Sequence, residues 1–167
     1  LFAVLQRGVH KVTLMDVRRP ENFDVVLNAV ASVAPWVAEK VTYAECKVDE
    51  MGERLSPGTS ILGVHACGGL TDQCLRIARE LNSRVAVMPC CYGNNHMHGP
   101  KVLDRMLGGL LAVDVDRTYR MESHGYTMDW QFIPQAISPM NRILVGEPPA
   151  EVRSSGVRDL ESIGQQK

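Results

Sequence analysis

The sequence predicts an α/β domain with a Rossmann-like, doubly wound and mostly parallel sheet that ends in an antiparallel hairpin. Between residues 11 and 88, short apolar segments alternate with segments of helical periodicity. Such alternation is typical of parallel sheets with helices on both faces, because a crossover helix must join parallel neighbours. Two of the apolar segments run into small and reactive side chains, in GVHACGGLTD (63–72) and VAVMPCCY (85–92). Near the end, two apolar segments are joined by a short connector that favours an antiparallel return.

The composition fits one domain with a sizeable core. The chain has 167 residues, of which 45% are apolar and 22% are charged. We expect the α/β domain to cover residues 1–147 and a polar tail to cover residues 148–167. A net charge of −1 gives no field that would hold nucleic acid by itself.

Compartment and membrane contact are predicted from the cysteines and the apolar segments. The five cysteines are odd in number and include an adjacent pair, which favours reduced thiols and a cytoplasmic location. No segment approaches the roughly 18 consecutive apolar residues that suggest a membrane span.

In the first part of the chain, the pattern predicts two strands and one complete helix. Residues 1–7 have helical spacing, and residues 11–18 form a short apolar strand that ends on Asp16. The helix covers residues 23–33, with Asn22 or Asp24 as its cap and with Val26, Val30 and Val33 on one face. Residues 41–48 form the second strand, and residues 49–58 form a polar loop.

The second part is predicted in the same way. Residues 60–64 and 85–88 are strands, and Thr71 caps the helix between them, whose apolar face carries Leu75, Ala78 and Leu81. A polar loop at residues 93–100 is a candidate substrate loop. Two helices at residues 101–111 and 117–124 precede the hairpin of residues 126–132 and 142–145.

These residues resemble a known family. The acid that closes an early strand, HACGGLTD after one strand, PCC after the next, and GYTMDWQF followed by SPMNRILV are similar to the class I S-adenosylmethionine-dependent methyltransferases. Within these, the chain resembles the branch of Trm13-like tRNA ribose methyltransferases. The resemblance covers residues 1 to about 147 and implies a seven-stranded sheet whose last hairpin is antiparallel. It also implies S-adenosylmethionine as the cofactor and methyl transfer to an oxygen or nitrogen as the reaction.

The resemblance implies cofactor contacts at the ends of two early strands. Asp16, with Val17 after it, matches the acid that binds the ribose hydroxyls, and a carboxylate suits a vicinal diol because it accepts two donors. Asp49, with Val48 beside it, matches more loosely the place that receives the adenine. The alternatives are a surface turn acid for Asp16 and one of several loop acids for Asp49.

The resemblance places the reaction at the two later strand ends. His65, Ala66, Cys67 and Gly68 match positions that face the methionine part of the cofactor and the acceptor, where small residues let the backbone approach closely. Residues 89–92 match positions that face the substrate, with Pro89 and Tyr92 as contacts and Tyr92 able to stack a base.

The chemistry of these side chains suggests catalytic roles. His65 is the candidate base for a hydroxyl acceptor. Cys90 and Cys91, with Cys67, are candidates for a variant mechanism in which a thiolate attacks a pyrimidine ring before methyl transfer, although a buried cysteine at a strand end is more often an apolar filler.

One departure from the family concerns the glycine-rich motif that approaches the methionine end of the cofactor. It should precede Leu1 and is absent from the sequence. We therefore expect a fragment of a longer polypeptide, whose sheet lacks its central strand, or else a degenerate relative without a cofactor site.

Other interpretations stay open. His65, Cys67, Cys90, Cys91, His96 and His98 offer ligands for a zinc or redox site, but their spacing forms no ordinary zinc motif and adjacent cysteines are an awkward pair for one tetrahedral ion. A non-catalytic methyltransferase-like scaffold is a third reading. The acceptor is open, with RNA implied by the resemblance, and it is undecided whether six basic residues form one patch: Arg18, Arg19, Lys101, Arg105, Arg117 and Arg120. The oligomeric state is undetermined.

Overall fold

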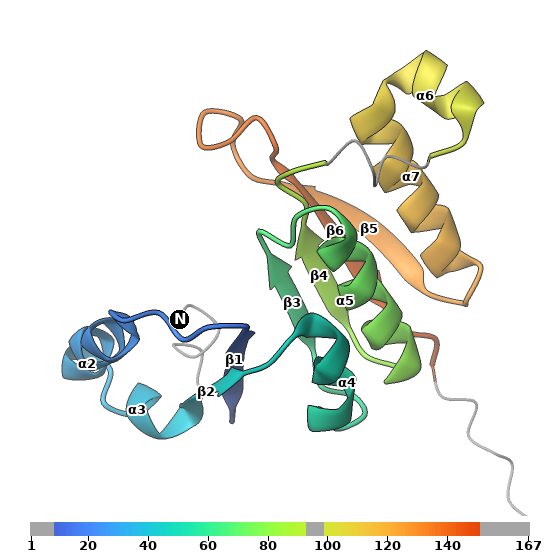
Figure 1. Ribbon diagram of the computed structural model, residues 1–167. Coiled ribbons are helices and arrows are strands. Elements are labelled where there is room, and N and C mark those ends of the chain that lie inside the picture. Colours follow the sequence, from blue (N-terminus) through green and yellow to red (C-terminus); the bar gives the residue numbers. More distant parts are fainter. Residues whose placement is uncertain (1–8, 93–98, 151–167) are drawn as a thin grey trace, which may run out of the picture.

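The computed structural model describes residues 9–92 and 99–150 and shows a mixed α/β fold (Figure 1). Its strands form two separate sheets, one of two strands and one of four. The strands are β1 (Val12–Asp16), β2 (Val41–Glu45), β3 (Ile61–Val64), β4 (Val85–Met88), β5 (Thr127–Phe132) and β6 (Arg142–Glu147). The helices are α2 (Phe23–Val33), α3 (Val37–Lys40), the 3₁₀ turn η1 (Val48–Glu50), α4 (Met51–Arg54), α5 (Gly69–Glu80), α6 (Lys101–Leu107) and α7 (Gly109–Glu122).

The larger sheet has the strand order β3-β4-β6-β5. β3 and β4 are parallel, with Val64 opposite Met88 at their carboxyl ends. β6 lies antiparallel between β4 and β5. The predicted antiparallel hairpin is therefore confirmed, and its second strand takes the inner position in the sheet.

Helices cover one face of this larger sheet. α5 and α7 contact each other and pack against the strands from the same side (Figure 1). Ile61 and Gly63 of β3 point to this covered face and are buried, whereas Leu62 and Val64 alternate to the other face and are exposed. Within residues 9–92 and 99–150, the prediction of helices on both faces therefore does not hold for this sheet, because no helix of that part covers Leu62 and Val64. We call this sheet with η1 and α4–α7 the four-stranded unit.

The core of the four-stranded unit is continuous. It contains eleven buried residues, contributed by β3, β4, β6, α5 and α7 and by Ala66 and Tyr126 in the turns. The apolar face of α5 supplies several of them, including Leu75 and Ala78, as its periodicity predicts. Met128 and Trp130 of β5 pack against this core from the edge of the sheet.

The smaller sheet, with α2 and α3, forms the second part, which we call the two-stranded unit. β1 and β2 are parallel, and Asp16 lies opposite Glu45 at their ends. Only Ala34, Val37 and Val41 form its buried cluster. Helix α2 has the predicted bounds but contains no buried residue.

The predicted apolar face of α2 was wrong at two of its three positions. Phe23, Leu27 and Val30 pack against the small cluster, whereas Val26 and Val33 are exposed. Both sets have spacings of three or four residues, so periodicity alone favours neither.

Several element bounds differ from the sequence predictions. The segment 49–58 contains η1 and α4 rather than only a loop. The chain turns at Gly108, whose φ of +79° suits glycine, so α6 ends there. The next helix, α7, starts at Gly109 and also covers most of the helix predicted at residues 117–124. Thr71 lies inside α5 rather than at its cap, which is Gly68.

Some predictions lie outside the described residues or stay untested. The expected helix at residues 1–7, the loop at residues 93–98 with His96 and His98, and the tail from residue 151 belong to the parts that the structure does not describe. In residues 9–92 and 99–150, no strand joins β1 to β3. Among the helices of the described part, none has the length and apolar character required to cross a membrane.

Candidate functional site

The two chemically reactive turns that follow β3 and β4 lie side by side. Parallel pairing of these strands places both carboxyl ends at the same edge of the sheet. The Gly68 N–H donates a hydrogen bond of 2.9 Å to the Cys91 carbonyl, which ties the first turn to the second. The sequence-predicted juxtaposition of these turns is present in the structure.

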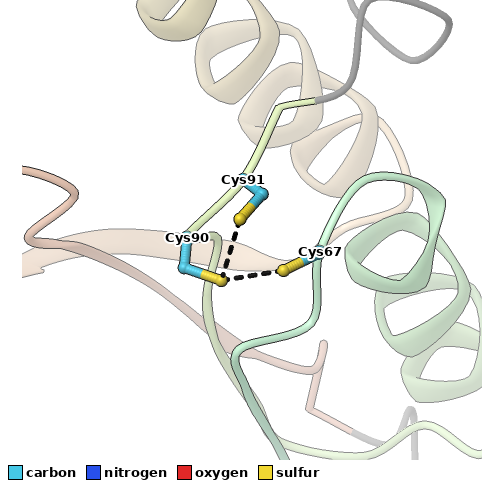
Figure 2. Close-up of side chains that lie close together, drawn as sticks. All are labelled: Cys67, Cys90 and Cys91. Carbon is cyan, nitrogen blue, oxygen red and sulfur yellow. Dashed lines mark hydrogen bonds between the residues drawn. The ribbon is translucent and has the colours of Figure 1, made fainter.

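Three thiols converge where the turns meet (Figure 2). The Sγ atoms of Cys67 and Cys90 are 2.9 Å apart, and those of Cys90 and Cys91 are 3.7 Å apart. All three sulfur atoms lie within 4.8 Å of one another. Cys67 and Cys90 are half-buried and Cys91 is exposed, so the cluster is open to solvent on one side. The hydrogen bond with Cys90 is the main cause that raises the pKa of the Cys67 thiol.

His65 lies beside the thiol cluster but is not part of it. Its backbone has a φ of +58°, an uncommon conformation for a residue with a side chain, and its side chain is exposed. Such strain is frequent at functional turns, although it does not assign a role by itself.

The rest of the first turn is held by local contacts. Gly68 has φ +56° and ψ −127°, a combination that essentially only glycine adopts without strain. Ala66 is buried, and its carbonyl accepts a hydrogen bond from the Thr71 hydroxyl. These contacts explain why a small residue, a glycine and a threonine occupy the three positions.

A buried charge network supports the second turn from below. Asp114 of α7 is fully buried and accepts hydrogen bonds from the Tyr92 hydroxyl (2.5 Å), Arg117 (3.2 Å) and Arg142 (2.9 Å). Tyr92 is thereby anchored through its hydroxyl and half-buried. Burial, followed by the hydrogen bond and charge of Asp114, raises its pKa far above the usual value. The structure thus gives Tyr92 an anchoring contact, and its stacking on a base stays a prediction.

The same network reaches the first turn through Arg117. This side chain is 1% exposed, and its guanidinium donates to the Gly68 carbonyl (3.2 Å) and to Asp72 (2.8 Å). Arg120 also donates to Asp72, at 2.9 Å. Burial acts to raise the pKa of Asp72, but the hydrogen bonds and charges of Arg117 and Arg120 outweigh it and hold that pKa below its usual value.

Sequence reasoning missed Asp114 and Arg142 and weighed Arg117 only as a member of an undecided basic patch. A signal was present in the sequence, because Asp114 and Arg117 stand three apart in a helix beside the apolar Ala112 and Val113. The three side chains around this buried carboxylate nonetheless come from three segments: the turn after β4, α7 and β6. Only their contacts show that they form one network.

The basic residues do not form one free patch. Arg117 is buried, Arg120 pairs with Asp72 and Asp116, and Arg18 and Arg19 pair with Glu21 and Asp24. Each of these charges has a nearby carboxylate. The described surface therefore adds no support for nucleic-acid binding through these four arginines.

Asp16 lies at the end of β1, in the two-stranded unit, as predicted. Its Oδ1 atom accepts the Val17 N–H at 2.6 Å, and both residues are exposed. In the described part of the chain, the second carboxylate oxygen has no hydrogen-bond partner. A shallow surface hollow begins two residues further on and is lined by residues 18–22.

The remaining predicted cofactor and substrate residues have mixed environments. Val48 is half-buried and packs against the core of the four-stranded unit, while Asp49 is exposed in η1. Pro89 is fully buried directly after β4. Of these three, only Asp49 is freely accessible to a ligand in this structure.

Comparison with solved structures gives a distant likeness. No family model matches the chain, and no curated protein matches it. A solved structure from Clostridium thermocellum, described as a "putative rRNA-methylase", is 14% identical, with a TM-score of 0.49. The likeness covers 84% of this chain and 74% of that one. Overlap at this level does not bear on the activity, which has to be argued from the strand order and the site.

Proposed function

We propose that this chain forms part of an S-adenosylmethionine-dependent methyltransferase domain that acts on an oxygen or nitrogen acceptor. The observation that carries the proposal is the strand order β3-β4-β6-β5, with β6 antiparallel between two strands that run the other way. An antiparallel last hairpin is what the sequence resemblance implies for the end of the sheet. Reactive turns at the carboxyl ends of β3 and β4 support the proposal, because ligands bind at that edge in open α/β sheets.

The residues at the end of β1 fit the ribose of the cofactor. The Asp16 carboxylate is exposed, and one of its oxygens is oriented by the Val17 N–H while the other is available. A carboxylate in this state accepts hydroxyl donors from a diol. Val17 is an exposed apolar residue at 66% and would be covered when a ligand binds there.

The residues of the β3 and β4 turns would position the acceptor. S-adenosylmethionine, when bound, supplies a methyl group that is already activated, so orientation and exclusion of water are the main tasks of the protein. Arg117 and the Gly68–Cys91 hydrogen bond fix the two turns relative to each other. His65 is exposed at this edge and would take the proton from a hydroxyl acceptor. RNA is the acceptor that the resemblance implies.

Calorimetry with S-adenosylhomocysteine tests the cofactor assignment. It should be done on the full natural polypeptide that carries these residues. Asp16→Asn is expected to weaken binding by roughly ten- to a hundredfold, the effect of losing hydrogen bonds to a charged group. Asp24→Asn is the matched control, since this acid lies in the same unit but pairs with Arg19 on the surface. Absence of binding, or equal effects of both substitutions, would overturn the proposal.

Transfer of a labelled methyl group to total cellular RNA tests the acceptor. His65→Ala is expected to reduce transfer far more than it weakens S-adenosylhomocysteine binding, because the exposed imidazole is the candidate base. If protein or small molecules are labelled instead of RNA, the assignment of RNA as the acceptor is wrong, but the assignment of the cofactor stands.

A further inference from the structure

We propose that Cys67, Cys90 and Cys91 form a binding site for one thiophilic divalent cation of the Zn²⁺ type. The proposal does not depend on methyl transfer. It rests on the convergence of three sulfur atoms from two turns, all within 4.8 Å of one another. Thiolate sulfur is the ligand that Zn²⁺ and softer ions prefer in proteins.

The sulfur positions suit such an ion. Two zinc–sulfur bonds of roughly 2.3 Å at a tetrahedral angle separate their sulfur atoms by roughly 3.8 Å. The Cys90 and Cys91 Sγ atoms are already 3.7 Å apart, so adjacency in sequence does not prevent joint ligation. The 2.9 Å between Cys67 and Cys90 has to widen by about 1 Å, which side-chain rotation of two half-buried residues can provide.

Three ligands rather than two favour a metal over a disulfide. A disulfide would use Cys67 and Cys90 and leave the Cys91 thiol unexplained, although that thiol turns toward Cys90 from an exposed position (Figure 2). Three protein ligands with solvent on one side leave a fourth position for water or a substrate atom, as in catalytic zinc sites.

The surroundings compensate the charge of the bound state. Binding converts three thiols to thiolates, releases three protons to solvent and leaves a net charge of −1 on the cation with its ligands. Cys67 immediately precedes Gly68, the N-cap of α5, and the dipole at this end of a helix stabilises negative charge. Arg117, which also pairs with Asp72 and Asp114, donates to the carbonyl of Gly68, the next residue, and so holds this part of the turn in place.

The ligand-bearing turns are also held in place before a cation binds. The Gly68 N–H contacts the Cys91 carbonyl at 2.9 Å, so the backbones that carry Cys67 and Cys91 are tied together. Preorganised ligands lose less conformational entropy on binding, which raises affinity.

Metal binding is measured on the untagged full chain, with its thiols kept reduced by a non-thiol reductant. We expect one equivalent of Zn²⁺ per chain, and one equivalent of Co²⁺ with a sulfur-to-cobalt charge-transfer band. Cys91→Ala removes one ligand from an exposed position and should leave the fold intact. It is expected to weaken Zn²⁺ binding more than about a hundredfold, since even outer contacts of metal ligands account for ten- to a hundredfold. Cys67→Ala and Cys90→Ala should act alike.

Cys46→Ala is the matched control, because Cys46 is a cysteine of the two-stranded unit, is buried and has no place in the cluster. It should keep full Zn²⁺ and Co²⁺ binding. Absence of the charge-transfer band in the folded wild type, or Cys91→Ala binding as the wild type does, would overturn the site. Mass spectrometry that finds a Cys67–Cys90 disulfide without reductant, together with no metal binding after reduction, would also overturn it and identify a redox pair instead.

Discussion

The two units of the molecule use the same parallel strand pairing but differ in how they are held together. In the four-stranded unit, eleven buried residues form one core and a fully buried carboxylate holds two arginines and a tyrosine. In the two-stranded unit, three buried residues form the core, and the ion pairs of α2 and its preceding turn lie on the surface. In both units, residues predicted to be functional lie at the ends of strands.

The difference shows what positions a site. Two strands with the helices α2 and α3 cover little apolar surface, and isolated two-stranded sheets are marginal at best. Asp16 is therefore carried by a weakly packed part of the described chain, whereas the thiol cluster and His65 are carried by a densely packed one. We therefore expect the turns after β3 and β4 to keep their geometry under mildly destabilising conditions in which the end of β1 loses its own.

The largest difference in stability between the units is expected from two separate variants, one that removes a buried carboxylate and one that removes an exposed carboxylate. Asp114→Asn keeps the side-chain shape but leaves Arg117 and Arg142 without their shared counterion, and loss of a buried partner destabilises by about 3–5 kcal/mol. Asp24→Asn breaks the exposed pair with Arg19 and should cost about 1 kcal/mol or less. Urea denaturation of both variants measures the free energy of unfolding. Similar losses would mean that the network does not stabilise the larger unit.

A smaller contrast is expected from one substitution in both cores. Val87 of β4 and Val37 of α3 are both 0% exposed. Val87→Ala should cost about 2–4 kcal/mol, because the dense surroundings keep the cavity open. Val37→Ala should cost about 1.5 kcal/mol, the transfer energy of two methyl groups, since the sparse cluster can close around the change. Thermal or urea unfolding distinguishes the two, and equal costs would contradict the difference in packing.

The third contrast is a pH dependence of stability through Asp72. Its pKa is lower in the folded state than in the unfolded chain, so its contribution is complete above the unfolded value of about 4 and is lost as pH falls through the folded value. Asp72→Asn should therefore reduce the free energy of unfolding by about 1.5–3 kcal/mol at pH 7, with a difference from wild type that shrinks below pH 4. Urea unfolding between neutral and acidic pH measures it.

Glu21→Gln is the control for that experiment. The Arg18–Glu21 pair lies in the two-stranded unit with side chains 81% and 93% exposed. Its loss should change stability little at any pH. If the free energies of unfolding of Asp72→Asn and wild type differ by the same amount down to the lowest pH, the charge of the Asp72 carboxylate does not stabilise the fold.

Local patterns were enough to locate most elements of the fold. The bounds of α2 and β4 match the periodicity of residues 23–33 and 85–88, and the hairpin of β5 and β6 follows from two apolar segments with a short connector. The reactive residues after β3 and β4 were placed at one edge because parallel strands end on the same side. These features depend on residues close together in the chain, so the sequence alone determined them.

Other features depend on contacts between distant segments, and only the tertiary structure decided them. Periodicity allowed two apolar faces for α2, and packing selected Phe23, Leu27 and Val30. In the sequence, the adjacent Cys90 and Cys91 are an awkward pair for binding one metal ion. Only the fold shows that the turn after β3 brings the Cys67 sulfur close to both. Asp114 became the centre of a network because Tyr92, Arg117 and Arg142 reach it from three segments. A charge is tolerated in a core only when its partners are present, and two of these partners, Tyr92 and Arg142, lie 22 and 28 residues away in the sequence.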